Sequence, residues 1–92
     1  MLITFDPVKN ERNVRLRGLS FEQAADFAFD SALFAVDERK EYHETRFVAM
    51  GLLGSRVHVL CFIEMPDGIR VISLRKANPR EVKRYAQAKS AD

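Results

Sequence analysis

The chain has 92 residues, of which 47% are hydrophobic and 30% charged, and its net charge at pH 7 is +2. This length and composition are those of one globular domain, residues 1–92, with a modest core, and they exclude a low-complexity or repeat protein. No run of about 18 apolar residues is present to cross a membrane and no signal peptide is evident, so we expect a cytoplasmic protein without membrane contacts.

A short strand and a helix are predicted at the N-terminus. Residues 2–5, LITF, favour a strand, and Asp6-Pro7 then supplies a helix N-cap and a proline at the first helical position. We expect the helix to run from Pro7 to about Arg17 with a mostly polar, exposed surface. Gly18 can take the left-handed conformation that commonly ends a helix.

A second helix is predicted after Gly18. Ser20 and Gln23 have the spacing of a capping box. Apolar residues then recur at helical spacing and predict a helix face that packs on a sheet: Phe21, Ala24, Ala25, Ala28 and Phe29. The helix is expected to end near Asp30, and residues 33–36 are a further candidate strand.

Three consecutive strands are predicted in the second half of the chain. The charged segment 37–44, DERKEYHE, has no periodicity, which indicates a loop. Residues 46–53 and 56–65 favour strands on either side of a Gly-Ser hairpin turn, and a Pro-Asp-Gly turn precedes a strand at 69–74. Tight turns between neighbouring strands predict an antiparallel meander.

The stretch IRVISLRKANPREVKRY, residues 69–85, combines a strand, a cap and a helix. Asn78 suits an N-cap and Pro79 the first position of a helix that we expect to reach about Ala88. The cations of this stretch, opposed only by Glu81, are Arg70, Arg75, Lys76, Arg80, Lys83 and Arg84. Residues 47–92 hold eight Lys and Arg against four Asp and Glu. This half is therefore the candidate surface for a polyanion, although solvation of a surface helix explains the same charges.

Together these elements predict an α+β fold with two N-terminal helices, a curved antiparallel sheet of three to four strands and a C-terminal helix. Helices on one face of the sheet would leave the other face open to basic side chains. His43 and His58 lie in different elements and Cys61 in an apolar run, so neither a metal site nor a cofactor is predicted. A single cysteine forms no intramolecular disulfide, as expected in a reducing compartment.

Metal-free cleavage of RNA is chemistry that this composition can support. RNA carries its own nucleophile, the 2′-hydroxyl, so an enzyme needs cations at the scissile phosphate and groups that move protons. Arginine suits the first task, and its high pKa makes it unsuited to the second. The candidate proton carriers are Glu44, Glu81, Tyr85, His43, His58 or a lysine. Glu81, Arg84 and Tyr85 share one helix face, a spacing that equally describes an ion pair beside a docking tyrosine.

Three stretches resemble the BrnT family of bacterial type II toxins: FDPVKNERNVRLRGLSFEQA, DERKEYHETRFVAMGLL and IRVISLRKANPREVKRY. The resemblance covers nearly the whole chain and is most specific in the third stretch. It implies a fold like that of the RelE-type ribonucleases and a ribonuclease that inhibits translation. It also implies a cognate, BrnA-like antitoxin that covers the active face and binds operator DNA through its own DNA-binding part, so that the toxin reaches DNA only through the antitoxin.

The family pattern transfers unevenly to this chain. A lysine and a histidine usually precede the glycine that matches Gly18, where this sequence has Leu16 and Arg17, and the usual Gly-Glu before the third strand is His43-Glu44. The resemblance implies these catalytic candidates: Arg46, Arg70 and Arg75 for holding phosphate, and Glu44, Glu81 and Tyr85 for moving protons. His43 is a candidate replacement for the missing histidine. Further RNA-binding candidates are Arg17, Lys76, Arg80 and Arg84.

Three hypotheses of function follow, of which the third is a structural or regulatory subunit whose exposed apolar residues would form a partner surface. The first is a metal-independent endoribonuclease toxin, which the basic strand–helix stretch and the family resemblance favour. The alternative is a non-catalytic module that binds RNA or a protein on the same basic face. Arg17 in place of the usual histidine, and the lack of an obvious acid–base pair in the sequence, favour the alternative.

Overall fold

The computed structural model describes residues 1–39, 41 and 43–91, so residues 40 and 42 of the predicted charged loop lie outside the described part. The helical elements are α1 (Pro7–Arg17), α2 (Pro79–Ser90) and two short 3-10 helices, η1 (Phe21–Asp26) and η2 (Phe29–Ser31). The strands are β1 (Leu2–Phe5), β2 (Leu33–Val36), β3 (Phe47–Leu53), β4 (Arg56–Met65) and β5 (Gly68–Lys76). None of the helices in these residues has the length and apolar character needed to cross a membrane.

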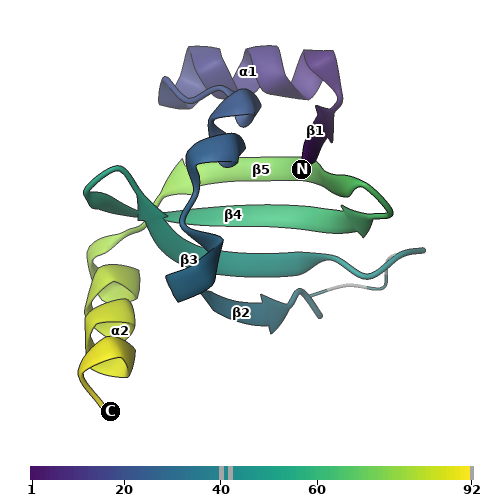
Figure 1. Cartoon of the computed structure of the whole chain (residues 1–92). Coiled ribbons are helices and arrows are strands. Elements are labelled where there is room, and N and C mark those ends of the chain that lie inside the picture. The colour runs from purple at the N-terminus through teal and green to yellow at the C-terminus, as the bar shows by residue number, and fades with distance from the viewer. Residues whose placement is uncertain (40, 42, 92) are drawn as a thin grey trace.

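Within the described residues, five strands form one sheet in the order β1-β5-β4-β3-β2 (Figure 1). The neighbours from β2 to β5 pair antiparallel, as the predicted meander requires, and β1 pairs parallel with β5. The expectation of an antiparallel sheet of three to four strands is therefore wrong. β1 fits against β5 because Gly68 has no side chain: a Cβ there would lie 1.9 Å from the carbonyl oxygen of Leu2.

The segment predicted as a second helix forms two 3-10 turns instead of an α-helix. The capping box is present, because the Ser20 amide donates to Gln23 Oε1 and the Ser20 side chain accepts from the backbone of η1. The chain becomes extended at Phe27, which bridges to Leu53 of β3, and the Ala28 amide donates to a β3 carbonyl oxygen at 2.9 Å. These bonds to the sheet replace the bonds that a continuing α-helix would need.

One face of the sheet forms the main core. Side chains alternate along each strand, and we call the face that carries Leu60, Phe62 and Leu74 the core face. Phe21 and Ala24 of η1 pack on it and are almost completely buried. Of the apolar residues predicted to dock this segment on a sheet, Phe21, Ala24 and Phe29 do so, whereas Ala25 is exposed and Ala28 is only half-buried.

The opposite face, here called the cleft face, carries Val57, Val59 and Cys61 of β4. α2 covers one end of this face, because Tyr85 packs in a cluster with Met50, Val57 and Val59. Helical elements therefore lie on both faces of the sheet, and the expectation that they occupy only one is wrong. Figure 1 shows α1 along the β1–β5 side of the sheet and α2 near the end of β5.

Candidate functional site

A cleft of about 460 Å³ opens on the part of the cleft face that α2 leaves uncovered. Its floor is apolar and includes Ala35 of β2, Val48 of β3 and Val59 of β4. The arginines that line it come from three separate parts of the described chain: Arg17 at the end of α1, Arg39 after β2 and Arg75 on β5. Two acidic residues, Asp37 and Glu38, also line the cleft, so that three arginines face two carboxylates. Guanidinium groups over an apolar floor are suited to an anion such as a phosphate.

A bulge in β5 determines which side chains face the cleft. Two consecutive residues of β4 pair with Ser73 and Val71, so Ile72 is an extra residue between them. Strict alternation would put Val71 and Ser73 on one face of the sheet. With the bulge, Val71 stays in the core while Ser73 and Arg75 line the cleft.

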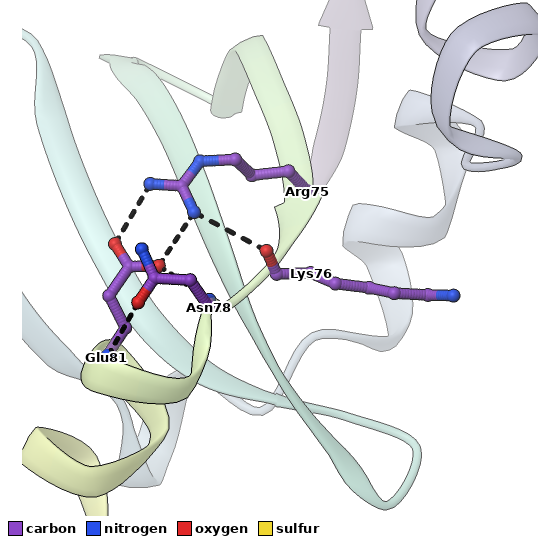
Figure 2. A network of polar contacts seen from close by, with 4 residues as sticks. All are labelled: Arg75, Lys76, Asn78 and Glu81. Carbon is purple, nitrogen blue, oxygen red and sulfur yellow. Dashed lines mark hydrogen bonds and ion pairs between the residues drawn. The ribbon is translucent and has the colours of Figure 1, made fainter.

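Glu81 holds the guanidinium of Arg75 in place, as Figure 2 shows. Arg75 Nη1 donates to Glu81 Oε1 at 2.7 Å and Nη2 donates to Oε2 at 2.9 Å. Nη1 also donates to the Lys76 carbonyl oxygen at 3.4 Å. Glu81 Oε1 accepts from the Asn78 amide, and Asn78 Oδ1 accepts from the Glu81 amide. This capping box begins α2 and therefore connects the strand arginine to the helix.

The pairing keeps Glu81 ionised near neutral pH. Hydrogen bonding to Arg75 lowers the pKa of Glu81 to about 2, against the opposing effect of burial and with help from the Asn78 amide. Hydrogen bonding to Glu81 likewise raises the pKa of Arg75. A carboxylate of such low basicity is a poor proton acceptor near neutral pH, so the geometry favours Glu81 as a positioning group for Arg75.

Arg75 keeps part of its hydrogen-bonding capacity for a ligand. A guanidinium has five N–H donors, and the bonds to Glu81 and Lys76 use the two on Nη1 and one on Nη2. No described residue accepts from Arg75 Nε. The Nε–H and the second Nη2–H form a fork that can hold two phosphate oxygens while Glu81 stays bound.

Arg39 reaches the cleft from the segment after β2, where Asp37 orients it. Arg39 Nε and Nη2 donate to the two carboxylate oxygens of Asp37 at 2.9 and 2.8 Å. The side chain of Asp37 is 2% exposed, whereas that of Arg39 is 81% exposed. Arg39 and Arg75 both line the cleft, so both can act on one anion bound there.

α1 places Arg17 at another side of the cleft. The buried Asn13 donates from Nδ2 to the carbonyl oxygens of Leu19 and Leu74, each at 2.9 Å, and so fastens α1 to β5. Gly18 ends the helix with φ at 69°, a left-handed conformation that favours glycine. The predicted end of this helix is confirmed.

Cys61 and His58 have structural positions. Burial, followed by the charge of Asp37, raises the pKa of the Cys61 thiol and keeps it neutral. His58 is buried on the core face, with Nδ1 2.9 Å from the Arg56 carbonyl oxygen. Across the described ranges, no three His, Cys, Asp or Glu side chains gather in a way that could hold a metal ion.

His43, Glu44 and Arg46 line a second hollow, of about 490 Å³, next to the cleft. The two hollows share Val36, Asp37 and Glu38. His43 and Glu44 are exposed, and Arg46 is half-buried. The structure therefore brings these three predicted residues beside the arginine cleft.

The two other predicted strand residues lie apart from the cleft. Arg70 is exposed on the cleft face, where it pairs with Ile63, but it does not line the cleft. The side chain of Lys76 points away from the guanidinium of Arg75 in Figure 2. Of the strand cations in the C-terminal stretch, Arg75 is thus the one that the cleft includes.

The predicted residues of α2 also separate. Arg80 is exposed and does not line the cleft. Arg84 lines a neighbouring, largely apolar hollow together with Glu81. Tyr85 is 9% exposed and packs against the sheet, which is the position of a docking residue.

Sequence reasoning missed Asp37, Arg39 and Ser73. The first two fall in a charged segment without periodicity, and Ser73 reaches the cleft only because of the bulge. One local signal could have indicated the pair: Asp favours a bond to the backbone two residues on, and the Arg39 amide donates to Asp37 Oδ1 at 3.2 Å. Nothing local places that pair opposite β5.

Comparisons with known proteins agree with this architecture. A family model described as the ribonuclease toxin BrnT of type II toxin–antitoxin systems matches residues 5–81. The 1.1 Å crystal structure of the Brucella abortus ribonuclease toxin BrnT is similar in fold, with a TM-score of 0.63 and 24% sequence identity over 83% of this chain and 95% of that chain. A comparison with curated proteins finds no match. The structural likeness is evidence of a shared fold.

Proposed function

Because the chain belongs to the BrnT family of ribonuclease toxins of type II toxin–antitoxin systems, we propose that it is an endoribonuclease that cuts RNA in the arginine cleft without a metal ion and so inhibits translation. One observation carries the proposal: Glu81 orients Arg75 at the cleft and leaves its Nε–Nη2 fork for a phosphate. A guanidinium fork matches the spacing of phosphate oxygens. A relationship of the fold to the RelE-type ribonucleases is part of the same proposal.

In this proposal the RNA supplies the nucleophile. The 2′-oxygen attacks the adjacent phosphorus, the O2′–P bond forms as the P–O5′ bond breaks, and the products are a 2′,3′-cyclic phosphate and a 5′-hydroxyl. A base takes the proton of the 2′-hydroxyl, and an acid gives a proton to O5′. Arg17, Arg39 and Arg75 stabilise the charge that develops on the phosphoryl oxygens. Effects of this kind are commonly worth about 10²–10³ in rate for each donor.

Proton transfer is assigned to the hollow beside the cleft. The pairing of Glu81 with Arg75 and the burial of Tyr85 argue against either group as a proton carrier. His43 and Glu44 are exposed in a hollow that shares a wall with the cleft. An imidazole and a carboxylate can together act as acid and base near neutral pH.

The proposal includes a protein partner. A type II toxin is expected to have a cognate antitoxin, and we propose that a BrnA-like antitoxin covers the cleft and binds operator DNA on behalf of the complex. The exposed cations and apolar floor of the cleft are complementary to a segment that presents carboxylates next to apolar side chains.

The direct test is cleavage of labelled single-stranded RNA by the purified protein in the presence of a chelator. We expect 2′,3′-cyclic phosphate ends, no cut at a 2′-deoxy position, and a loss of at least about 100-fold in kcat/KM for Arg75→Ala. Arg75→Lys keeps the charge without the fork and should recover only part of the rate. Arg56→Ala removes a cation at the β3–β4 hairpin, outside the cleft, and serves as the control. Cleavage that depends on a divalent ion, or equal rates for Arg75→Ala and Arg56→Ala, would contradict the proposal.

A non-catalytic module that binds RNA or protein on the same face is the second candidate. The observation in its favour is that Glu81, the carboxylate bonded to Arg75, is held in an ion pair and is not available as a base. Salt-sensitive RNA binding by wild-type protein that leaves the RNA intact with and without divalent ions would establish it.

The effect on cells is tested by inducing the chain in two bacterial cultures, the first without and the second with the neighbouring antitoxin gene. We expect arrested protein synthesis and fragmented RNA in the first culture, and normal growth in the second. Intact RNA and continued protein synthesis in the first culture, with the protein folded and abundant, would exclude inhibition of translation.

A further inference from the structure

A basic strip on α1 continues the arginine cleft. A third hollow, of about 190 Å³, lies between α1 and β5, and its helix side includes Lys9 and Arg12. It shares Arg17 and Ser73 with the cleft, so the two hollows adjoin at these residues. We call Lys9, Arg12 and Arg17 the α1 strip.

The cations of the α1 strip are accessible to a ligand. Lys9 and Arg12 stand three residues apart and therefore share one side of the helix. Both are exposed, and neither forms an ion pair with any residue in the described part of the chain. Glu11, the carboxylate within this helix, lines neither hollow. An anionic chain that leaves the cleft toward α1 therefore meets positive charge.

We propose that the α1 strip binds the backbone of single-stranded RNA on one side of the cleaved phosphate, so that the substrate is an extended single strand. The inference rests on the proposed function and adds the substrate class to it. Adjoining hollows of about 460 and 190 Å³ suit successive nucleotides of one strand.

The test compares Arg12→Ala with Arg15→Ala, which removes the same charge from the same helix. Arg15 is also exposed but lines neither hollow. The substrates are single-stranded RNAs of about twelve and about three nucleotides. The first is longer, and the second shorter, than the roughly four nucleotides that the smallest single-strand-binding domains cover. Arg12→Ala should lower kcat/KM for the longer RNA by about tenfold and leave that for the shorter RNA within about twofold. Arg15→Ala should leave both unchanged.

A binding measurement gives a second readout that does not require cleavage. The ligand is a non-cleavable 2′-deoxy analogue of the longer strand, and its association constant K is measured at several salt concentrations. The negative slope of log K against log salt should become shallower by about 0.7 for each cation removed from the α1 strip. The Lys9→Ala/Arg12→Ala double variant should show twice the change of Arg12→Ala. Arg15→Ala should keep the slope of the wild-type protein.

Several outcomes would overturn the proposal. Equal kcat/KM values and equal salt slopes for Arg12→Ala and Arg15→Ala would do so. An equal loss of kcat/KM on both RNA lengths in Arg12→Ala would also do so, because it indicates damage to the cleavage site itself. An effect of Arg12→Ala on antitoxin binding alone would assign the strip to that protein instead. If the wild-type protein cleaves neither RNA, the proposed function fails, and the salt slopes then decide separately whether the α1 strip binds a single strand.

Discussion

At the scale of single residues, Glu81 links a strand, a helix and the cleft. Its carboxylate accepts from both Nη atoms of Arg75 and from the amide of Asn78. Asn78 and Pro79 identify the start of α2 from sequence. The contact with Arg75 could not be predicted in the same way, because it depends on how the chain turns between β5 and α2. Sequence reasoning therefore names Glu81 as a candidate proton carrier, whereas in the structure its carboxylate is bonded to Arg75.

The stability of the protein should depend on the ionisation of Glu81 in acid. Its pKa is about 2 in the folded protein, against an ordinary value of 4.5, so its ion pair stabilises the fold fully above about pH 4.5. This contribution is lost as the pH falls through 2. Glu81→Gln keeps a capping side chain but removes the charge, and we expect it to lower stability at pH 7 by about 0.5–1 kcal/mol.

Denaturant unfolding of the wild-type protein and Glu81→Gln at a series of pH values measures this effect. The difference between the two proteins should shrink as the pH falls from 4.5 toward 2. Glu22→Gln removes an exposed carboxylate of η1 that forms no ion pair within the described chain, and it is the control. A difference that stays constant over this pH range would show that the ion pair with Arg75 does not stabilise the fold.

At the scale of elements, α1 and β1 are held to β5 by a few specific contacts. The Asn13 amide bonds α1 to a β5 carbonyl oxygen, and Gly68 admits the backbone of β1. The sequence predicts where both elements begin and end, from the Asp6-Pro7 cap and from Gly18. It does not predict that β1 joins β5 in parallel, because that pairing joins residues about 65 positions apart in the chain.

Removal of the Asn13 amide should loosen α1 and with it the position of Arg17. Asn13→Ala deletes two hydrogen bonds and leaves buried carbonyl oxygens without a donor, which costs about 1–3 kcal/mol. Gln87→Ala removes an exposed amide from α2 and is the control. Thermal unfolding of the three proteins measures the difference. An equal melting temperature for Asn13→Ala and Gln87→Ala would mean that these bonds do not fasten the helix.

A side chain at position 68 should detach β1 from the sheet. In Gly68→Ala the added Cβ would overlap the backbone of Leu2, and overpacking of this kind costs at least about 1–3 kcal/mol. Amide hydrogen exchange of residues 2–5 should become faster, while exchange in β4 should change little. Ser55→Ala, in the exposed β3–β4 turn, is the control. Protection of residues 2–5 equal to that in the wild-type protein would contradict this account of the edge.

At the scale of the whole molecule, the sequence predicts the local elements and the structure adds their long-range pairing. β2 and β4 have the predicted bounds, since alternating or continuous apolar residues and turn residues are local signals. The bulge at Ile72 and the docking of α2 on the cleft face depend on contacts between distant segments. Consequently Arg75 was identifiable from sequence as a candidate, whereas its convergence with Arg17 and Arg39 was not.

The central claim is that RNA binds with its phosphate over the cleft face between these arginines. It is tested most directly by titrating isotope-labelled protein with a single-stranded RNA blocked by a 2′-deoxy substitution at the cleavage position, and following the backbone amide signals. The account predicts the largest changes at Arg17, Arg39, Ser73 and Arg75, and little change at His58 on the core face. Changes that gather on the core face or along the exposed side of α2, with Ser73 and Arg75 unaffected, would contradict it.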